Sequence, residues 1–185
     1  VDGKDMIAVS KLRDLGATQF DGMEYHPECD RIARDIDERA LNTSSRKTVA
    51  AGERLVKALE AWTAKTKADL AAQRFDLSTP AGRIVVSGSG NDVHEEQDVL
   101  LLVDLGGDDN YRGGIGGSTL TQTVTLVVDL AGNDRYVAEG ETTGAQGSGV
   151  LGTGVLIDAA GDDTYRAYGS SQGYGLFGTG LLADL

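Results

Sequence analysis

The sequence predicts a mainly β protein: a parallel β-solenoid with about 26 residues per coil, preceded by a small α-helical segment. Three observations support this prediction. An eight-residue segment recurs in the second half of the chain, short β-branched runs separate its copies, and a helical apolar pattern is confined to the residues before Pro80. We therefore expect two parts: a helical segment or cap over residues 1–78 and solenoid repeats over residues 79–185.

The apolar pattern of the first part predicts two helices that pair as a hairpin. Pro27 suits the first turn of a helix that runs to Leu41. Residues 42–45 (Asn-Thr-Ser-Ser) interrupt the pattern and offer N-caps for a second helix over residues 46 to about 75. The turn-forming residues 78–82 then mark the boundary with the solenoid.

The second part contains two repeated elements. The first opens with aspartate, continues as a Gly/Asp-rich turn and ends in tyrosine; it occupies residues 104–111, 129–136 and 158–165 and restarts at Asp184. The second begins with Gln-Gly and occupies residues 146–154 and 172–180. Both elements recur after 26 residues in the last coils, whereas the earlier offsets are 25 and 29, so insertions fall in a loop between them. Residues 90–94 resemble a degenerate first copy or cap.

Short β-branched runs between the turns are the expected strands. They are residues 84–86, 99–103, 123–128, 155–157 and 181–182. A period of about 26 suits one coil of a parallel β-helix with two or three strands. Consecutive coils stack about 4.8 Å apart, so equivalent residues are expected to form columns.

Acidic residues form three such columns. The first contains Asp104, Asp129, Asp158 and Asp184; the second contains Asp109, Asp134 and Asp163; the third contains Asp108, Asn133 and Asp162. Carboxylates at this spacing repel by roughly 1 kcal/mol in bulk water and more near a protein surface. Two interpretations remain open. Either these ten residues are ligands of Ca²⁺, or each first aspartate caps its own turn while the others point to water.

The net charge of −12 lies entirely in the repeats. From residue 85 onward there are fifteen acidic residues and three arginines, together with 21 of the 26 glycines. A surface of this sign repels phosphate backbones and anionic lipids, which argues against nucleic acid and favours divalent cations as partners. No apolar run is long enough to span a bilayer, so no membrane insertion is expected. The single Cys29 excludes a disulfide within the chain.

The turn segments resemble a known calcium-binding repeat. Residues 107–111, 132–136 and 161–165 are similar to the second half of the RTX nonapeptide, the repeat of calcium-binding β-rolls. The resemblance implies that Ca²⁺ is held between coils by aspartates and neighbouring carbonyl groups, and that the protein is exported. Two features depart from that repeat: the leading Gly-Gly is Asp-Leu or Asp-Ala, and the period is 26 rather than nine. The module also resembles Gly/Asp-rich bacterial repeat proteins of unknown function.

Several other patterns have simpler interpretations. Tyr111, Tyr136 and Tyr165 predict a stacked column, either a structural ladder or a carbohydrate-stacking strip. The glycines of residues 147–152 match a dinucleotide fingerprint but recur one coil later, which indicates tight corners or close backbone approach. The metal-type residues His26, Glu28 and Cys29 are expected at an exposed helix start. His94 is expected to be a solvated edge residue.

The leading interpretation is a non-catalytic calcium-binding solenoid, an extracellular or periplasmic scaffold or adhesion module. Its partners would be calcium ions, with glycans or other copies of itself as further candidates. One alternative is a lyase or hydrolase acting on polysaccharides, although Arg112, Arg135 and Arg166 follow the repeat whereas an active site should break it. Another is an ice-binding protein that uses the alternating threonines of residues 119–125.

The two ends of the stack are also predictable. The last strand, with Leu181 and Leu182, should present unpaired backbone groups, so we expect further coils or end-to-end association. The helical segment is expected to close the opposite end.

Overall fold

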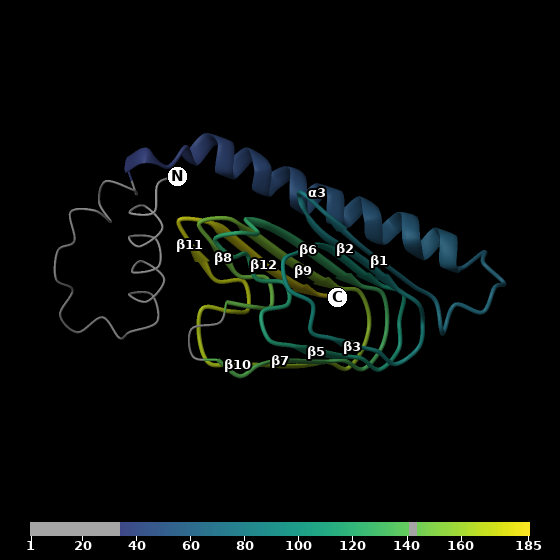
Figure 1. The fold of residues 1–185 in the computed structure, drawn as a ribbon. Helices are drawn as coiled ribbons and strands as arrows, with labels where there is room; N and C mark the ends of the chain where they lie inside the picture. Colours follow the sequence, from purple (N-terminus) through teal and green to yellow (C-terminus); the bar gives the residue numbers. More distant parts are fainter. Residues whose placement is uncertain (1–33, 141–143) are drawn as a thin grey trace.

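The computed structural model describes residues 34–140 and 144–185 and shows one long helix beside a β-solenoid (Figure 1). The helix is α3 (Glu38–Thr63). The strands are β1 (Arg74–Thr79), β2 (Gly82–Ser87), β3 (Val93–His94), β4 (Val99–Asp104), β5 (Asn110–Arg112), β6 (Val124–Asp129), β7 (Arg135–Ala138), β8 (Gly149–Val150), β9 (Thr153–Asp158), β10 (Thr164–Ala167), β11 (Gly175–Leu176) and β12 (Thr179–Asp184).

Parallel pairing between coils confirms the predicted solenoid. A six-stranded sheet has the order β1-β2-β4-β6-β9-β12, a four-stranded sheet the order β10-β7-β5-β3, and a third sheet pairs β11 with β8. Every pair is parallel except the β1–β2 hairpin. Asp129 is in register with Asp104 on one side and Asp158 on the other, and Asp158 is in register with Asp184. Each of the five predicted β-branched runs lies in a different strand of the six-stranded sheet, namely β2, β4, β6, β9 and β12.

One part of the interior of the coils is an apolar core. Leu102, Val127 and Leu156 project inward from consecutive strands of the six-stranded sheet and are 0% exposed. They pack against Tyr111 and Tyr136, which project inward from the four-stranded sheet. Because side chains alternate along a strand, every second residue of each coil contributes to this core.

Helix α3 covers the outer face of the six-stranded sheet (Figure 1). We had expected the helical segment to close an end of the stack, and α3 does not do so. Its Val56 packs against a cluster formed by the outward residues Leu126, Val128, Val155 and Ile157. The expected end cap was wrong because these strands are apolar on both faces, and their outer face also has to be covered. The first strand of the six-stranded sheet belongs instead to the antiparallel β1–β2 hairpin.

The predicted helix break at residues 42–45 is also wrong, because α3 runs through them. Its N-cap is Asp37, whose carboxylate accepts the Ala40 N–H at 2.9 Å. Within the helix Ser45 donates to the carbonyl of Leu41, and its hydroxyl lies 2.8 Å from the Thr153 hydroxyl of β9. Hydroxyl groups that find partners in this way are compatible with a helix interior.

The boundary between the parts differs in detail from the expectation. Helix α3 ends at Thr63, and residues from Arg74 onward already form β1. The predicted turn at residues 78–82 is the tip of the β1–β2 hairpin, where Pro80 and Ala81 connect the paired strands. The expected helix from Pro27 to Leu41 lies partly outside the described residues; the described part is interrupted at residues 36–37, and α3 begins at Glu38. Among the described residues, no helix combines the length and apolarity that crossing a bilayer requires.

The outermost strands at the other end are paired on one side only. β12 pairs with β9, β10 with β7 and β11 with β8, and none has a second neighbour among the described residues. Leu181 and Leu182 of β12 are partly exposed. Association through these edges remains a prediction.

The contact between α3 and the sheet can be tested at Gly52. A Cβ at this position would lie 2.7 Å from the Ile157 Cδ1 and 3.1 Å from the Leu126 Cδ1. We expect Gly52→Glu to lower the free energy of unfolding by at least about 2 kcal/mol, because a carboxylate would enter an apolar contact. Ala51→Glu, on the exposed side of the same turn, should change it by less than about 0.5 kcal/mol. Equal urea midpoints for the two variants would contradict this packing.

Candidate metal centre

The first aspartate column lies inside the solenoid. Asp104, Asp129 and Asp158 are the last residues of β4, β6 and β9, and each is 0% exposed. They project to the same side as Leu102, Val127 and Leu156, two residues earlier, because strand side chains alternate. Asp184 continues the column in register but is exposed.

A stack of four aromatic rings faces this column. Ring centroids are 4.8 Å apart from His94 to Tyr111, 4.4 Å from Tyr111 to Tyr136 and 4.7 Å from Tyr136 to Tyr165, with interplanar angles of 16° or less. The structural-ladder interpretation of the tyrosines is confirmed. An external carbohydrate strip is excluded at Tyr111 and Tyr136, which are only 1% exposed.

His94 occupies the tyrosine position of the first coil. It pairs in register with Tyr111, which confirms that residues 90–94 are a copy of the repeat. The expectation of a solvated edge was wrong, since His94 is 0% exposed. The alignment of residues 90–94 with residues 107–111 was the signal in the sequence that placed it in the aromatic column.

The aromatic stack donates hydrogen bonds to the first column. The Tyr111 hydroxyl donates to Asp129 Oδ2 at 2.5 Å, and the Tyr136 hydroxyl donates to Asp158 Oδ2 at 2.8 Å. In the first coil, His94 Nε2 lies 2.9 Å from Asp104 Oδ2. The first three rings thus contact the aspartate that follows them by 10 to 22 residues, whereas the Tyr165 hydroxyl donates to Asp158 Oδ2, seven residues earlier, at 3.2 Å.

The other oxygen of the first-column aspartates caps the turn. Asp104 Oδ1 accepts the Gly106 N–H at 2.9 Å, and Asp129 Oδ1 accepts the Ala131 N–H at 3.1 Å. The turn-capping interpretation is therefore confirmed for these two residues. Asp158 Oδ1 is buried and has no hydrogen-bond partner among the described residues.

The second column links neighbouring coils and does not point to water. Asp109 Oδ1 accepts the N–H of Asp92 at 2.5 Å, Asp134 Oδ1 accepts that of Asp109 at 2.6 Å, and Asp163 Oδ1 accepts that of Asp134 at 2.7 Å. Asp109 and Asp134 are 1% and 2% exposed. Within the described part of the chain, no donor reaches the Oδ2 atoms of Asp109, Asp134 and Asp163, although all three atoms are buried.

The third column is on the outside of the same turns. Asn133 donates its backbone N–H to Asp108 Oδ1 at 2.9 Å, and Asp162 donates its N–H to Asn133 Oδ1 at 3.2 Å. Asp108, Asn133 and Asp162 are exposed. These residues connect the coils but do not join the inner carboxylates, so the ten predicted residues separate into an inner and an outer set.

The inner carboxylates form two overlapping groups. The first cluster is Asp104, Asp109 and Asp129; the second cluster is Asp129, Asp134 and Asp158. In each cluster one oxygen from every residue lies within 4.8 Å of the others. Both clusters contain a buried oxygen without a donor, and the second contains two.

Burial makes these carboxylates difficult to ionise. It raises the pKa of Asp129 to about 9, with repulsion from Asp134, Asp104 and Asp158 adding to the effect and the hydrogen bond from Tyr111 opposing it. Burial also raises the pKa of Asp109 to about 7, that of Asp158 to about 7 and that of Asp134. The clusters therefore retain protons at neutral pH unless another cation replaces them.

The first coil carries its own cation. Burial alone would lower the pKa of His94, but hydrogen bonds with Asp104 and Glu96 outweigh it and raise that pKa to about 9. His94 is thus an imidazolium at neutral pH, held between two carboxylates, and Arg74 forms an ion pair with Glu96. The later coils have tyrosine in place of this histidine and lack its charge.

Glycine leaves room beside the second column. A Cβ at Gly132 would lie 1.7 Å from the Gly107 carbonyl oxygen and 2.8 Å from Asp134 Oδ1, and a Cβ at Gly161 would lie 1.8 Å from the Gly132 oxygen. No side chain fits there, so the carboxylate and the carbonyl of the preceding coil share a space that only glycine keeps open.

Of the remaining sequence predictions, one is confirmed, one is wrong and one concerns residues that the structure does not describe. Close backbone approach is confirmed at Gly147 and Gly149, where a Cβ would lie 2.0 Å from carbonyl oxygens of β12. The flat threonine face is wrong, because residues 119–123 precede β6 and Thr125 is buried, donating to the Val99 carbonyl at 2.8 Å. His26, Glu28 and Cys29 lie outside the described residues.

The hydrogen bond from the aromatic stack to the aspartates can be tested at Tyr136. Tyr136→Phe keeps the ring stack but removes the hydroxyl that donates to buried Asp158. The Tyr165 hydroxyl still donates to the same Asp158 oxygen at 3.2 Å, so we expect the free energy of unfolding to fall by about 0.5–1.5 kcal/mol, the net contribution of one hydrogen bond. Tyr168→Phe, at a 65% exposed residue, should change it by less than about 0.5 kcal/mol. Urea denaturation followed by circular dichroism measures both, and equal losses would argue against the interior hydrogen bond.

Comparison with family models, curated proteins and solved structures gives no match for this chain. The candidate metal centre therefore depends on the chain's own geometry and on the turn resemblance described above.

Proposed function

We propose that this chain is a non-catalytic calcium-binding solenoid that acts as a scaffold or adhesion module outside the cytoplasm, in the periplasm or the extracellular space. Ca²⁺ occupies the first and second clusters between successive coils. The observation that carries the proposal is the pair of buried oxygens, Asp109 Oδ2 and Asp134 Oδ2, which have no hydrogen-bond donor among the described residues and belong to residues of the first and second clusters.

The donor set suits a hard divalent cation. Ca²⁺ binds oxygen ligands at about 2.3–2.6 Å, so two ligands of one ion lie up to about 5 Å apart. The oxygens of each cluster lie within 4.8 Å of one another. Each cluster offers three carboxylates. The carbonyl groups of Gly107 and Gly132, beside the second column, are available as further ligands. Asp129 belongs to both clusters and would bridge two ions.

Burial favours a structural role for these carboxylates. Asp104, Asp129 and Asp158 are 0% exposed, so a polymeric substrate has no access to them. A lyase or hydrolase needs its acid and base within hydrogen-bond reach of the substrate. Extracellular calcium modules bind the ion with dissociation constants of about 0.1–1 mM, which suits an ion that is always present outside the cell.

Calcium should stabilise the fold most at high pH. The folded pKa values of Asp109, Asp158 and Asp129 are raised to about 7, 7 and 9, above the usual unfolded value near 4. Stability from retained protons is therefore full below about pH 4 and is lost as the pH rises through 7 to 9. In EDTA the Tm should fall from pH 5 to pH 8, and millimolar Ca²⁺ should raise it by several degrees at pH 8 but little at pH 5. Absence of a calcium effect at pH 8 would reject the ion and leave protons as the neutralising species.

A matched pair of variants locates the ion. Asp134→Asn keeps the Oδ1 acceptor but replaces the unpartnered charge with an amide, so we expect a higher Tm in EDTA at pH 8 and a smaller gain from Ca²⁺. Asp162→Asn makes the same chemical change in the exposed third column and should preserve the calcium response. Thermal unfolding with and without Ca²⁺ measures the difference. If Asp162→Asn reduced the gain in Tm from Ca²⁺ more than Asp134→Asn does, the ion would have to bind at the exposed third column.

A further inference from the structure

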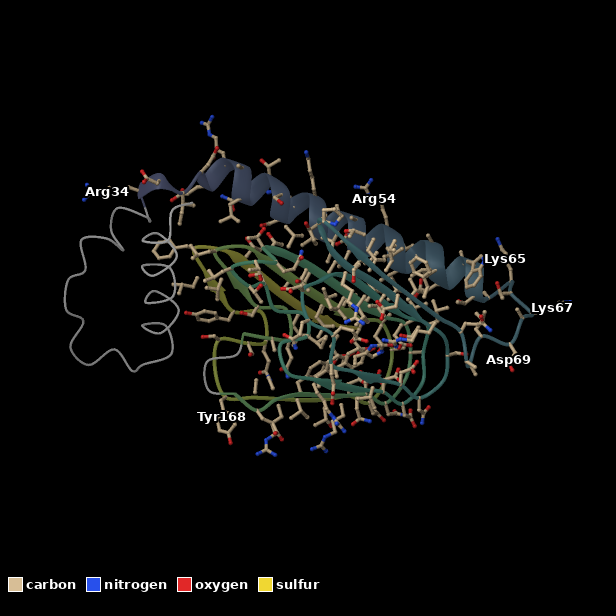
Figure 2. All side chains as sticks on the ribbon, in the orientation of Figure 1. Arg34, Arg54, Lys65, Lys67, Asp69 and Tyr168 are labelled. Atoms are coloured by element: carbon tan, nitrogen blue, oxygen red, sulfur yellow. The ribbon has the colours of Figure 1, made fainter. Side chains whose placement is uncertain are left out.

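The arginines of residues 85–185 are gathered on a single face. Residues 85–185 contain three arginines and no lysine: Arg112 on β5, Arg135 on β7 and Arg166 on β10. All three are exposed and alternate with the inward residues Tyr111, Tyr136 and Tyr165. They therefore project outward from the four-stranded sheet, on the side of the solenoid away from α3. Figure 2 shows nitrogen-tipped side chains along this face, near the labelled Tyr168.

The three arginines lie on successive coils of the solenoid. Arg112 and Arg166 are both in register with Val137, so they belong to one column and are two coils apart. This separates their backbones by roughly 10 Å. Arg135 lies two residues before Val137 on the intervening strand, so the three guanidinium groups spread over three coils.

Two of these charges have no counter-ion in the described part of the chain. Arg112 forms an exposed ion pair with Glu95 at 2.9 Å. Arg135 and Arg166 form no ion pair with any residue that the structure describes. A groove of about 480 Å³ runs between the coils here, lined by Asn110, Arg112, Arg135, Val137 and Glu139. It combines two cationic groups with an amide, an apolar side chain and the carboxylate of Glu139.

We propose that this outer face of the four-stranded sheet binds a linear carboxylated polysaccharide that lies across the strands, parallel to the solenoid axis. Guanidinium groups bind carboxylates through two parallel hydrogen bonds, and a row of them suits a polymer whose acidic groups repeat. Tyr168, 65% exposed, offers a ring on which a sugar can pack, and Asn110 and Thr164 offer hydrogen bonds to hydroxyl groups. The proposal names the ligand class of the proposed adhesion module and so depends on that function.

The surrounding charge favours a narrow ligand. The exposed Asp108 and Asp162 of the third column lie four residues before Arg112 and Arg166. A duplex nucleic acid or a lipid surface is broad enough to meet these acidic turns and would be repelled. A single glycan chain can follow the arginines without meeting these acidic turns, and acidic groups beyond about 8 Å are screened at physiological ionic strength. Glu139, in the groove itself, is the acidic side chain that such a ligand has to avoid.

Calorimetric titration with polygalacturonate tests the proposal, with methyl-esterified polygalacturonate as the uncharged ligand of the same backbone. EDTA at pH 6 prevents calcium bridging, and circular dichroism in the same buffer checks the fold. We expect wild-type protein to bind the acidic polymer, with affinity falling as salt rises, and not the esterified one. The triple variant Arg112→Gln, Arg135→Gln, Arg166→Gln should lose at least tenfold in affinity.

The control is a triple variant with the same change in charge, Arg46→Gln, Arg54→Gln and Lys57→Gln, on the exposed side of α3. It should bind within twofold of wild type. Absence of wild-type binding, equal binding of both polymers or an equal loss in the control variant would each overturn the proposal. None of these results bears on the calcium response of the thermal unfolding, so the two proposals can fail separately.

Discussion

The structure depends on placing a row of carboxylates inside a closed protein coil. Asp104, Asp129 and Asp158 lie where a solenoid of this kind would otherwise have apolar side chains. Burying unpaired charge in this way is strongly unfavourable, so the neighbouring residues are arranged to compensate. Stacked rings supply hydroxyl donors, turn amides supply N–H groups, and glycines keep the turns narrow enough for coils to share these bonds.

The first coil and the later coils solve the charge problem differently. In the first coil a permanent cation, the imidazolium of His94, lies beside Asp104. In the later coils tyrosines donate hydrogen bonds but bring no charge, so the second cluster must take up something from solution, either protons or a metal ion. The carboxylate charge of the first coil is therefore neutralised by a side chain of the protein, whereas that of the later coils depends on the pH and the cations of the solution.

The repeat made much of the fold predictable, because parallel pairing forces residues at equal offsets into columns. Asp104, Asp129 and Asp158 had to align once their strands paired. The fate of each column was harder to predict, since spacing does not reveal whether a turn aspartate points inward or outward; the second column is buried and the third is exposed. The path of α3 was missed because an apolar stripe on a helix does not identify the surface that it covers.

The position of α3 has a consequence for how the molecule comes apart. Linear repeat proteins tend to lose their end units one at a time, because each unit contacts only its neighbours. Here a single helix contacts β6, β9 and β12, which belong to three successive coils. Unfolding of the coil that contains β12 would also weaken the contacts of α3 with β6 and β9. The helix therefore couples the unfolding of one coil to that of the next. The three coils that α3 contacts are therefore expected to unfold together.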